Sequence, residues 1–171
     1  MNYATIKPWD IANGPGVRVS LFVSGCTHHC KDCFNPEAWD FDYGEPFTEA
    51  VMDHILDLLR PDYIRGITYL GGEPFDPHNQ PGLLALTQKI RAAYPEKSIW
   101  SFTGYVYGQN LPQLPGVTDA LLAGLDVLVD GPFIAARKNL SLRFRGSDNQ
   151  RLIDLPKTLK TGAVVLWDET Q

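Results

Sequence analysis

The sequence predicts an α/β protein with a mostly parallel sheet, arranged as a partial, open (β/α) barrel with a pair of strands near the C-terminus. Apolar, β-branched runs alternate with amphipathic segments over the first 130 residues, which is typical of right-handed βαβ units. Each of these runs ends in a glycine-rich or polar turn. About four such units in 171 residues cannot close an eightfold barrel, which takes roughly 250 residues.

The first predicted strand covers residues 17–23, an apolar run rich in β-branched residues. Residues 1–16 before it are predicted to be irregular, because they end in the turn signal Asn13-Gly14-Pro15-Gly16. Ser24-Gly25 ends the strand. Thr48 can cap a helix that runs to about Arg60, since apolar residues recur at helical spacing behind it.

Three further strands follow, each ended by a turn and separated by amphipathic helices. The predicted strands cover residues 64–70, 98–102 and 125–129, and the predicted helices cover residues 81–94 and 119–123.

The alternation ends after residue 132. Residues 136–149 are basic and poor in apolar side chains. Residues 151–155 and 163–167 are predicted as two strands, and the short linker over 156–162 suggests an antiparallel or edge pair. Because the chain shows no repeat or domain linker, a single domain over residues 1–171 is expected.

Composition excludes several function classes. The chain is 44% hydrophobic and carries a net charge of −5, so nucleic acid is not an expected partner, because phosphate binding requires a basic face. No stretch has the apolar length of a membrane span, and the first 14 residues lack the apolar run of a signal peptide. We therefore expect a cytoplasmic protein with no membrane partner.

All three cysteines, Cys26, Cys30 and Cys33, lie within eight residues. Spacing this close predicts a metal or redox site. A structural zinc needs four ligands, so His28 or His29 would complete a zinc-dependent interaction module. A 4Fe-4S cluster held by only three thiolates would instead keep one iron open to a small molecule. The loop by itself leaves both interpretations open.

The turns after the other strands favour the cluster. In parallel α/β folds, chemistry sits where the carboxyl ends of the strands meet. The cysteine loop, Gly71-Gly72-Glu73-Pro74, Thr103-Gly104 and Asp130-Gly131 would share that edge. The glycine pair allows close backbone approach, since a Cβ would block a ligand there. A zinc module has no need of the other three turns.

The spacing C-x3-C-x2-C resembles the cluster loop of the radical S-adenosylmethionine (SAM) enzymes, and Gly71-Gly72-Glu73-Pro74 resembles the turn that holds the methionine amino group in that family. The resemblance implies the partial barrel of the radical SAM type and a 4Fe-4S cluster that binds SAM at its open iron. It also implies the site residues. The cluster ligands would be Cys26, Cys30 and Cys33, the methionine end would lie at Gly71, Gly72 and Glu73, and Thr103 and Asp130 are further SAM-binding candidates.

Other motifs narrow the resemblance. Ser101–Tyr105, Val129–Phe133 and Asn13–Arg18 are similar to segments of the glycyl-radical-enzyme activases, and Arg143–Arg151 is most similar to activases of the anaerobic (class III) ribonucleotide reductase. The resemblance runs from about residue 10 to the last predicted strand.

Such an activase would cleave SAM reductively and use the 5′-deoxyadenosyl radical to generate a glycyl radical on the large reductase subunit. It would need a low-potential electron donor such as flavodoxin, and no catalytic residue beyond the cluster ligands. The basic stretch from Arg137 to Arg151 is a candidate docking surface for the reductase.

The sequence departs from the pattern in two places. Asp32 stands where many radical SAM loops have an aromatic residue, and Pro132 stands where related activases have a lysine, so no basic partner is predicted for Asp130. His28 and His29 are expected to be exposed loop residues. A pyruvate formate-lyase activase, or a small-molecule enzyme similar to carboxy-deazaguanine synthase, is the alternative within the radical SAM enzymes.

Overall fold

The computed structural model describes residues 1–170, and these form a mixed α/β architecture around a seven-stranded sheet. The strands are β1 (Asn2–Asp10), β2 (Val17–Val23), β3 (Glu45–Pro46), β4 (Ile64–Gly71), β5 (Ser98–Phe102), β6 (Val127–Asp130) and β7 (Arg151–Asp154). The helices are α1 (Glu49–Leu59), α2 (Gln80–Ala93), α3 (Thr118–Ala123) and α4 (Leu155–Thr161), with short 3₁₀ helices at Pro36–Trp39, Leu111–Gln113 and Ala135–Arg137.

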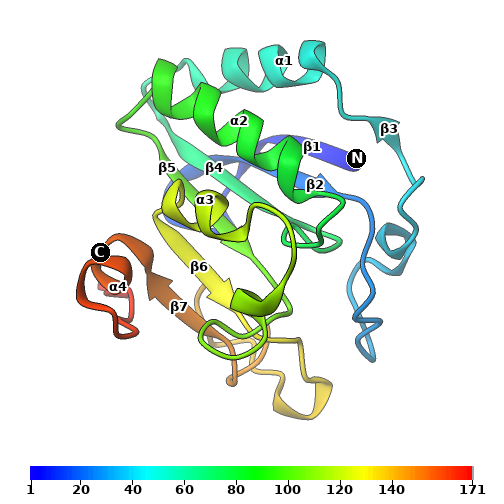
Figure 1. Cartoon of the computed structure of the whole chain (residues 1–171), viewed down its shortest axis with the longest axis vertical. Coiled ribbons are helices and arrows are strands. Elements are labelled where there is room, and N and C mark those ends of the chain that lie inside the picture. The colour runs from blue at the N-terminus through cyan, green and yellow to red at the C-terminus, as the bar shows by residue number, and fades with distance from the viewer. Residues whose placement is uncertain (171) are drawn as a thin grey trace.

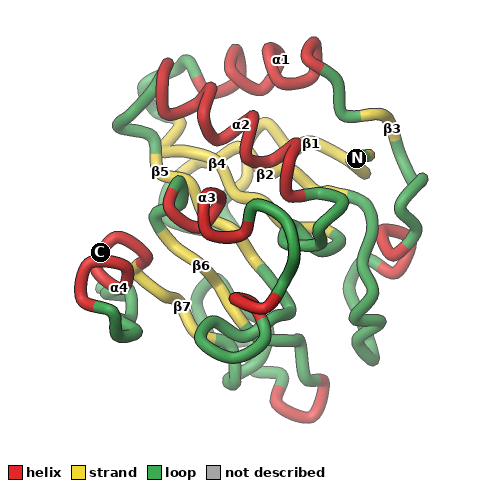
Figure 2. The backbone as a smooth tube through the Cα atoms, in the orientation of Figure 1, coloured by secondary structure: helices red, strands yellow, loops and turns green. Residues whose placement is uncertain are grey.

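The strand order is β3-β1-β2-β4-β5-β6-β7. The four central strands, β2, β4, β5 and β6, run parallel to one another, whereas β1, β3 and β7 pair antiparallel with their neighbours. Helices α1, α2 and α3 lie on one face of the sheet (Figure 1). Loops gather beyond the carboxyl ends of β5 and β6 (Figure 2). The predicted parallel sheet is therefore confirmed in its central part.

The predicted strands and helices between residues 17 and 130 are confirmed to within two residues. Thr48 caps α1 as expected, because its hydroxyl oxygen accepts a hydrogen bond from the Val51 backbone N–H at 3.4 Å.

The prediction that residues 1–16 are irregular was wrong for residues 2–10, which form β1. Thr5, Lys7 and Trp9 are exposed and alternate with more buried neighbours, which is the pattern of a half-buried strand. Pro8 cannot donate to a ladder, but it lies at a register irregularity between Lys7 and Asp10 where the pairing is interrupted. The polar residues and Pro8 made this alternation hard to recognise in the sequence.

The predicted C-terminal strand pair is confirmed only in part, since residues 151–154 form β7 but residues 163–167 do not form a full strand. Residues 163–167 form only an isolated bridge between Ile153 and Leu166, and β7 pairs with β6 instead. The expected linker over 156–162 is helix α4. Asp154 caps this helix by accepting from the Lys157 N–H at 3.1 Å, and Gly162 ends it in the left-handed conformation at φ +74°.

The sheet has an apolar cluster on each face. Ile99 and Leu128 pack beneath the helices, whereas Trp100, Val127 and Val129 face the opposite side. Successive strand residues point to opposite faces, which explains the division. The second cluster is completed from the C-terminal third of the chain, by Leu152, Phe144 and Trp167.

Arg18 is fully buried at the amino ends of the central strands. Its guanidinium donates to the Thr68 hydroxyl at 2.9 Å, to the Ser98 hydroxyl at 2.8 Å and to the Ile67 carbonyl at 2.8 Å, and it lies 5.5 Å from the centre of the Trp100 ring. Burial lowers the pKa of Arg18 to about 10, so the side chain stays charged at neutral pH. One cation therefore joins β2, β4 and β5.

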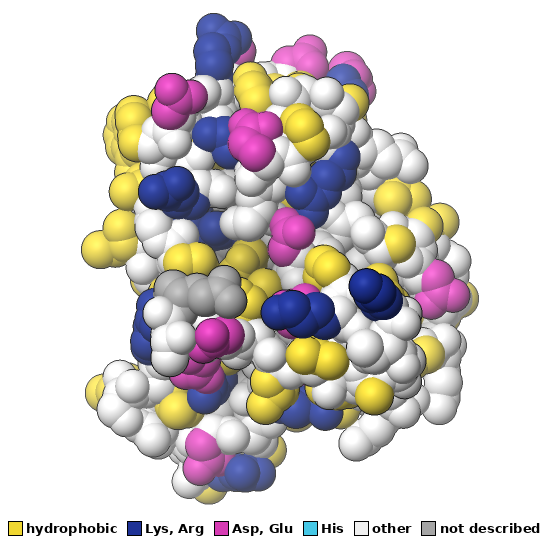
Figure 3. Space-filling view, turned by 90° about the vertical axis from the view of Figure 1, so that its left-hand side faces the viewer, with side chains coloured by type: hydrophobic (Ala, Val, Ile, Leu, Met, Phe, Trp, Pro, Cys, Tyr) yellow, Lys and Arg dark blue, Asp and Glu magenta, His cyan; other side chains and the backbone are white. Residues whose placement is uncertain are grey.

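Lys and Arg side chains alternate with Asp and Glu on the face shown in Figure 3, so neither sign of charge dominates there. Among residues 1–170, no helix is both long and apolar enough to cross a membrane.

We expect Arg18→Met to lower the free energy of unfolding by about 3 kcal/mol, because it leaves buried hydroxyl and carbonyl oxygens without their donor. Urea unfolding at pH 7 measures the change. Arg65→Met is the matched control, since Arg65 is exposed on β4 and should change stability by less than about 0.5 kcal/mol. Equal losses in the two variants would contradict this account of Arg18.

Candidate functional site

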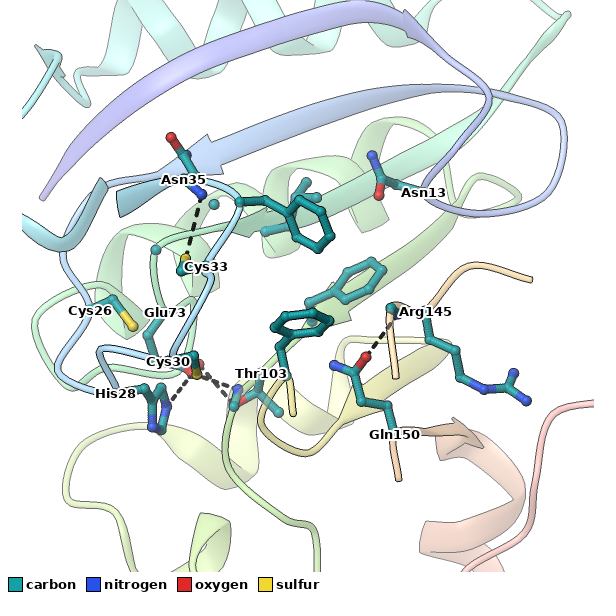
Figure 4. A pocket seen from close by; sticks show the side chains of 18 of the residues that line it. Asn13, Cys26, His28, Cys30, Cys33, Asn35, Glu73, Thr103, Arg145 and Gln150 are labelled. Carbon is teal, nitrogen blue, oxygen red and sulfur yellow. Dashed lines mark hydrogen bonds and ion pairs between the residues drawn. The ribbon is translucent and has the colours of Figure 1, made fainter. Parts of the chain in front are cut away.

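A cavity of about 500 Å³ opens at the carboxyl ends of the parallel strands. Figure 4 shows side chains from the cysteine loop and from the turns after β4 and β5 directed toward it. Phenylalanine rings form much of the remaining lining. The site residues that line the cavity are Cys26, Cys30, Cys33, Gly71, Gly72, Glu73 and Thr103, with Gly104 and Gly131 beside them.

Backbone hydrogen bonds hold the cysteine loop against the segment that follows it. The Gly25 N–H donates to the Ala38 carbonyl at 2.8 Å, and the Cys26 N–H donates to the Trp39 carbonyl at 3.1 Å. Cys26 is buried, and Cys30 and Cys33 are half-buried. Burial raises the pKa of the Cys26 thiol to about 11, so a bound metal would have to supply the electrostatic drive that keeps this thiol deprotonated.

Both histidines of the cysteine loop contact residues outside the loop. The His28 ring contacts Glu73, and the His29 ring stacks on Trp39 with centroids 4.5 Å apart. Within residues 1–170, no three His, Cys, Asp or Glu side chains are grouped closely enough to hold one metal ion. A structural zinc needs such a group, whereas a 4Fe-4S cluster lets each thiolate bind a different iron. Three cysteines on one cavity fit a 4Fe-4S cluster.

The Glu73 carboxylate is the centre of the site and is only 1% exposed. Its Oε1 accepts hydrogen bonds from the Thr103 hydroxyl and from the Phe75 N–H, both at 2.8 Å. Its Oε2 accepts from the Gly104 N–H at 2.8 Å and lies 2.7 Å from His28 Nε2. One carboxylate therefore joins the cysteine loop to the turns after β4 and β5.

His28 is the site residue that the sequence reasoning missed. It was expected to be exposed, but only 19% of its side chain is exposed, and its ring packs 4.5 Å from the Tyr105 ring. The hydrogen bond with Glu73 raises the pKa of His28. A Cβ on Gly104 would lie 2.6 Å from this ring. No local pattern indicates the contact, because His28 and Glu73 lie 45 residues apart.

The glycine pair packs backbone against backbone. A Cβ on Gly72 would lie 2.5 Å from the Gly25 carbonyl oxygen and 2.9 Å from that of Ala38. The Gly72 N–H donates to the Val23 carbonyl at 2.7 Å, and the Glu73 N–H donates to that of Gly25 at 2.8 Å. The turn after β4 thus supports the cysteine loop directly, which adds a second reason for glycine here beside the approach of a ligand.

The prediction of no basic partner for Asp130 was wrong. The residue was expected to lack a basic partner, but its buried carboxylate accepts a hydrogen bond from Arg151 Nε at 3.0 Å and from the Tyr107 N–H at 2.8 Å. Arg151 is its partner in the register between β6 and β7, which the sequence could not indicate because the strand pairing was not predicted. Gly131 lines the cavity, whereas Asp130 does not.

Three of the basic side chains between Arg137 and Arg151 form ion pairs within the chain. Arg137 pairs with Asp148, Arg145 pairs with Glu169, and Arg151 pairs with Asp130. Lys138 and Arg143 lie instead over the rings of Phe34 and Phe144, and the docking role of this stretch stays a prediction.

Comparisons with known proteins agree with this site. Residues 12–153 match the family model of the 4Fe-4S single cluster domain. The chain is 45% identical over 152 residues to the anaerobic ribonucleoside-triphosphate reductase-activating protein of Escherichia coli (strain K12), covering 88% of this chain and 96% of the relative. Proteins of the same name from Vibrio cholerae and Enterobacteria phage T4 are 42% and 41% identical, over 88% and 89% of this chain and 96% and 93% of theirs.

We expect Gly72→Ala to destabilise the protein by roughly 1–3 kcal/mol, because the new methyl group overlaps two backbone oxygens that cannot move aside. Thermal unfolding of the metal-free protein measures this. Gly108→Ala is the control, since Gly108 has φ +81° and open space around it and tests backbone strain without overlap. If Gly72→Ala leaves the unfolding temperature unchanged, the close packing described here is not rigid.

We expect Glu73→Gln to cost about 3 kcal/mol, because the amide NH₂ cannot accept from both backbone donors and one buried N–H loses its partner. Urea unfolding of the metal-free protein provides the measurement. Glu45→Gln, on the exposed strand β3, is the isosteric control and should be neutral. A neutral result for Glu73→Gln would remove the carboxylate from its central position.

Proposed function

The chain belongs to the 4Fe-4S single cluster domain family and to the anaerobic ribonucleoside-triphosphate reductase-activating proteins, and on that premise we propose that it is a radical SAM activase. It cleaves SAM reductively and generates a glycyl radical on the anaerobic ribonucleotide reductase. The observation that carries the proposal is the set of three cysteines that line one cavity. Three protein ligands leave one iron of a 4Fe-4S cluster open.

The residues present fit a cluster and SAM. Cys26, Cys30 and Cys33 would hold the cluster. The cavity volume of about 500 Å³ lies within the range of small-ligand sites. When bound, the cluster would supply the electron that breaks a carbon–sulfur bond of SAM, leaving methionine and the 5′-deoxyadenosyl radical.

The residues of the chain itself bind and orient SAM and exclude water from it. Gly71, Gly72 and Thr103 line the cavity and are proposed to contact SAM. Glu73 also lines it, but we assign Glu73 to positioning, since its two oxygens already accept hydrogen bonds from three surrounding donors and contact His28. We assign Asp130 to holding β7 against β6.

The phenylalanine rings on the cavity would keep water away from a reactive radical. Phe22, Phe102 and Phe133 line it from β2, β5 and the turn after β6. An apolar lining of this kind offers water few hydrogen-bonding groups.

We infer that the sheet forms the open (β/α) barrel of the radical SAM type, as one functional unit. The parallel central strands, the helices on one face and the cavity at the carboxyl ends support this inference. Residues from Lys7 to Gln150 line the cavity, so most of the chain contributes to one site. An incomplete barrel leaves a lateral opening for a segment of a large protein substrate.

The partner we propose is the large glycyl-radical subunit of the reductase, with a low-potential donor such as flavodoxin. The names of the relatives favour this partner over pyruvate formate-lyase or a small-molecule substrate. Reduced thiols are required for cluster binding, which favours the cytoplasm.

Anaerobic purification followed by electron paramagnetic resonance tests the proposal. The reduced protein, mixed with SAM and the anaerobic reductase, should give a glycyl-radical doublet, and Cys30→Ala should abolish it because the cluster loses a ligand. His54→Ala, on the exposed side of α1, should retain the doublet. Stoichiometric zinc in place of iron and sulfide, or a doublet that survives Cys30→Ala, would reject the proposal.

A further inference from the structure

The C-terminal tail, defined here as residues 163–170, returns from α4 along the edge of the sheet. The Asp154 N–H donates to the Val165 carbonyl at 2.9 Å, and the Trp167 N–H donates to the Leu152 carbonyl at 2.8 Å. This tail lies beyond residue 153, where the match to the 4Fe-4S family model ends.

Trp167 anchors the tail in the apolar cluster on the helix-free face. Its ring packs edge-on against Trp100 at 4.9 Å and against Phe144 at 6.2 Å, and Trp100 and Phe144 are themselves 5.6 Å apart. Phe144 has φ +57°, a left-handed conformation that an aromatic residue rarely adopts without support. The two tryptophan rings supply that support.

Glu169 binds Arg145, the residue that follows Phe144. Its carboxylate accepts from Arg145 Nη1 at 2.5 Å, and its carbonyl oxygen accepts from Arg143. Figure 4 shows the Arg145 side chain pointing away from the cavity, and only 15% of it is exposed. Among the described residues, its buried Nε has no hydrogen-bond partner. The guanidinium has its ion pair with Glu169 of the tail.

The residues that the tail holds are one wall of the cavity. The cavity wall is defined here as residues 142–146, of which Leu142, Phe144, Arg145 and Gly146 line the cavity. Phe144 also lines a second hollow on its other side, together with Trp100 and Trp167. Phe144 therefore lines both hollows, and Trp167 of the tail packs against it at the second one.

We propose that the tail positions this cavity wall, and that Trp167 and Glu169 are positioning residues for the entry of the partner's glycine-bearing segment. The proposal rests on the proposed function. Figure 4 shows Arg145 and the three cysteines on opposite sides of the cavity. The wall is therefore remote from the methionine end of SAM and bounds the part left for an extended segment of the reductase.

Hydrogen–deuterium exchange of the protein as purified, without SAM or reductase, tests the structural half. Trp167→Ala and Glu169→Ala should each speed exchange of residues 139–146 by about tenfold, while peptides from β4 keep their protection. Leu159→Ala, on the exposed side of α4, is the matched control and should change neither. Unchanged protection of residues 139–146 in both tail variants would overturn the proposal.

Activation kinetics test the functional half. Glu169→Gln and Trp167→Phe are conservative replacements, chosen so that a loss of activity does not result from misfolding. Glu169→Gln should raise the apparent KM for the reductase by about tenfold and leave kcat within about twofold. Cleavage of SAM in the absence of reductase should stay at the level of the unmodified protein. Trp167→Phe should keep most of the affinity that Trp167→Ala loses.

The charge-reversed pair Arg145→Glu with Glu169→Arg should recover part of the affinity that Arg145→Glu alone loses. An unchanged KM, or a parallel loss of SAM cleavage, would overturn the positioning role. If the unmodified protein cleaves no SAM at all, the proposed function fails, whereas the exchange experiment still decides whether the tail holds the wall.

Discussion

The site depends on one buried carboxylate. Glu73 lies in the turn after β4, accepts hydrogen bonds from Thr103 and Gly104 in the turn after β5, and contacts His28 of the cysteine loop. Three segments far apart in the chain therefore have one relative position. A buried carboxylate that loses a partner is strongly destabilising, and this penalty keeps the turns together before any cofactor binds. The cysteine loop has little regular structure of its own and takes its place from this contact and from the backbone of Gly72.

Arg18 has the corresponding role at the other end of the strands. It joins three strands through buried hydroxyl and carbonyl oxygens, and it lies over the ring of Trp100. Trp100 in turn contacts Phe144 and Trp167. The polar cross-links at the two ends and the aromatic cluster between them connect the rigid sheet to the wall of the cavity. Function on this scaffold therefore depends on loops that rigid strands position.

The central strands and helices were predictable because their signals are local. Apolar runs, glycine turns and the cap at Thr48 each act within a few residues. Strand β1 and helix α4 were missed for different reasons. In β1, polar residues on the open face and Pro8 concealed the alternation. In α4, the cap at Asp154 is a local signal, but the short apolar run after Gly162 suggested a full strand, whereas it pairs with β7 through one isolated bridge.

The sequence by itself determined the cluster loop and its candidate ligands, since the spacing of Cys26, Cys30 and Cys33 is a covalent property. It also determined that the turns after the parallel strands share one edge, because parallel strands all end on the same side of the sheet. Only the tertiary structure decided what those turns bind within the chain. Whether His28 faces solvent or Glu73, and whether Asp130 has a cation beside it, depends on strands and loops brought together across long stretches of sequence, where no local preference acts.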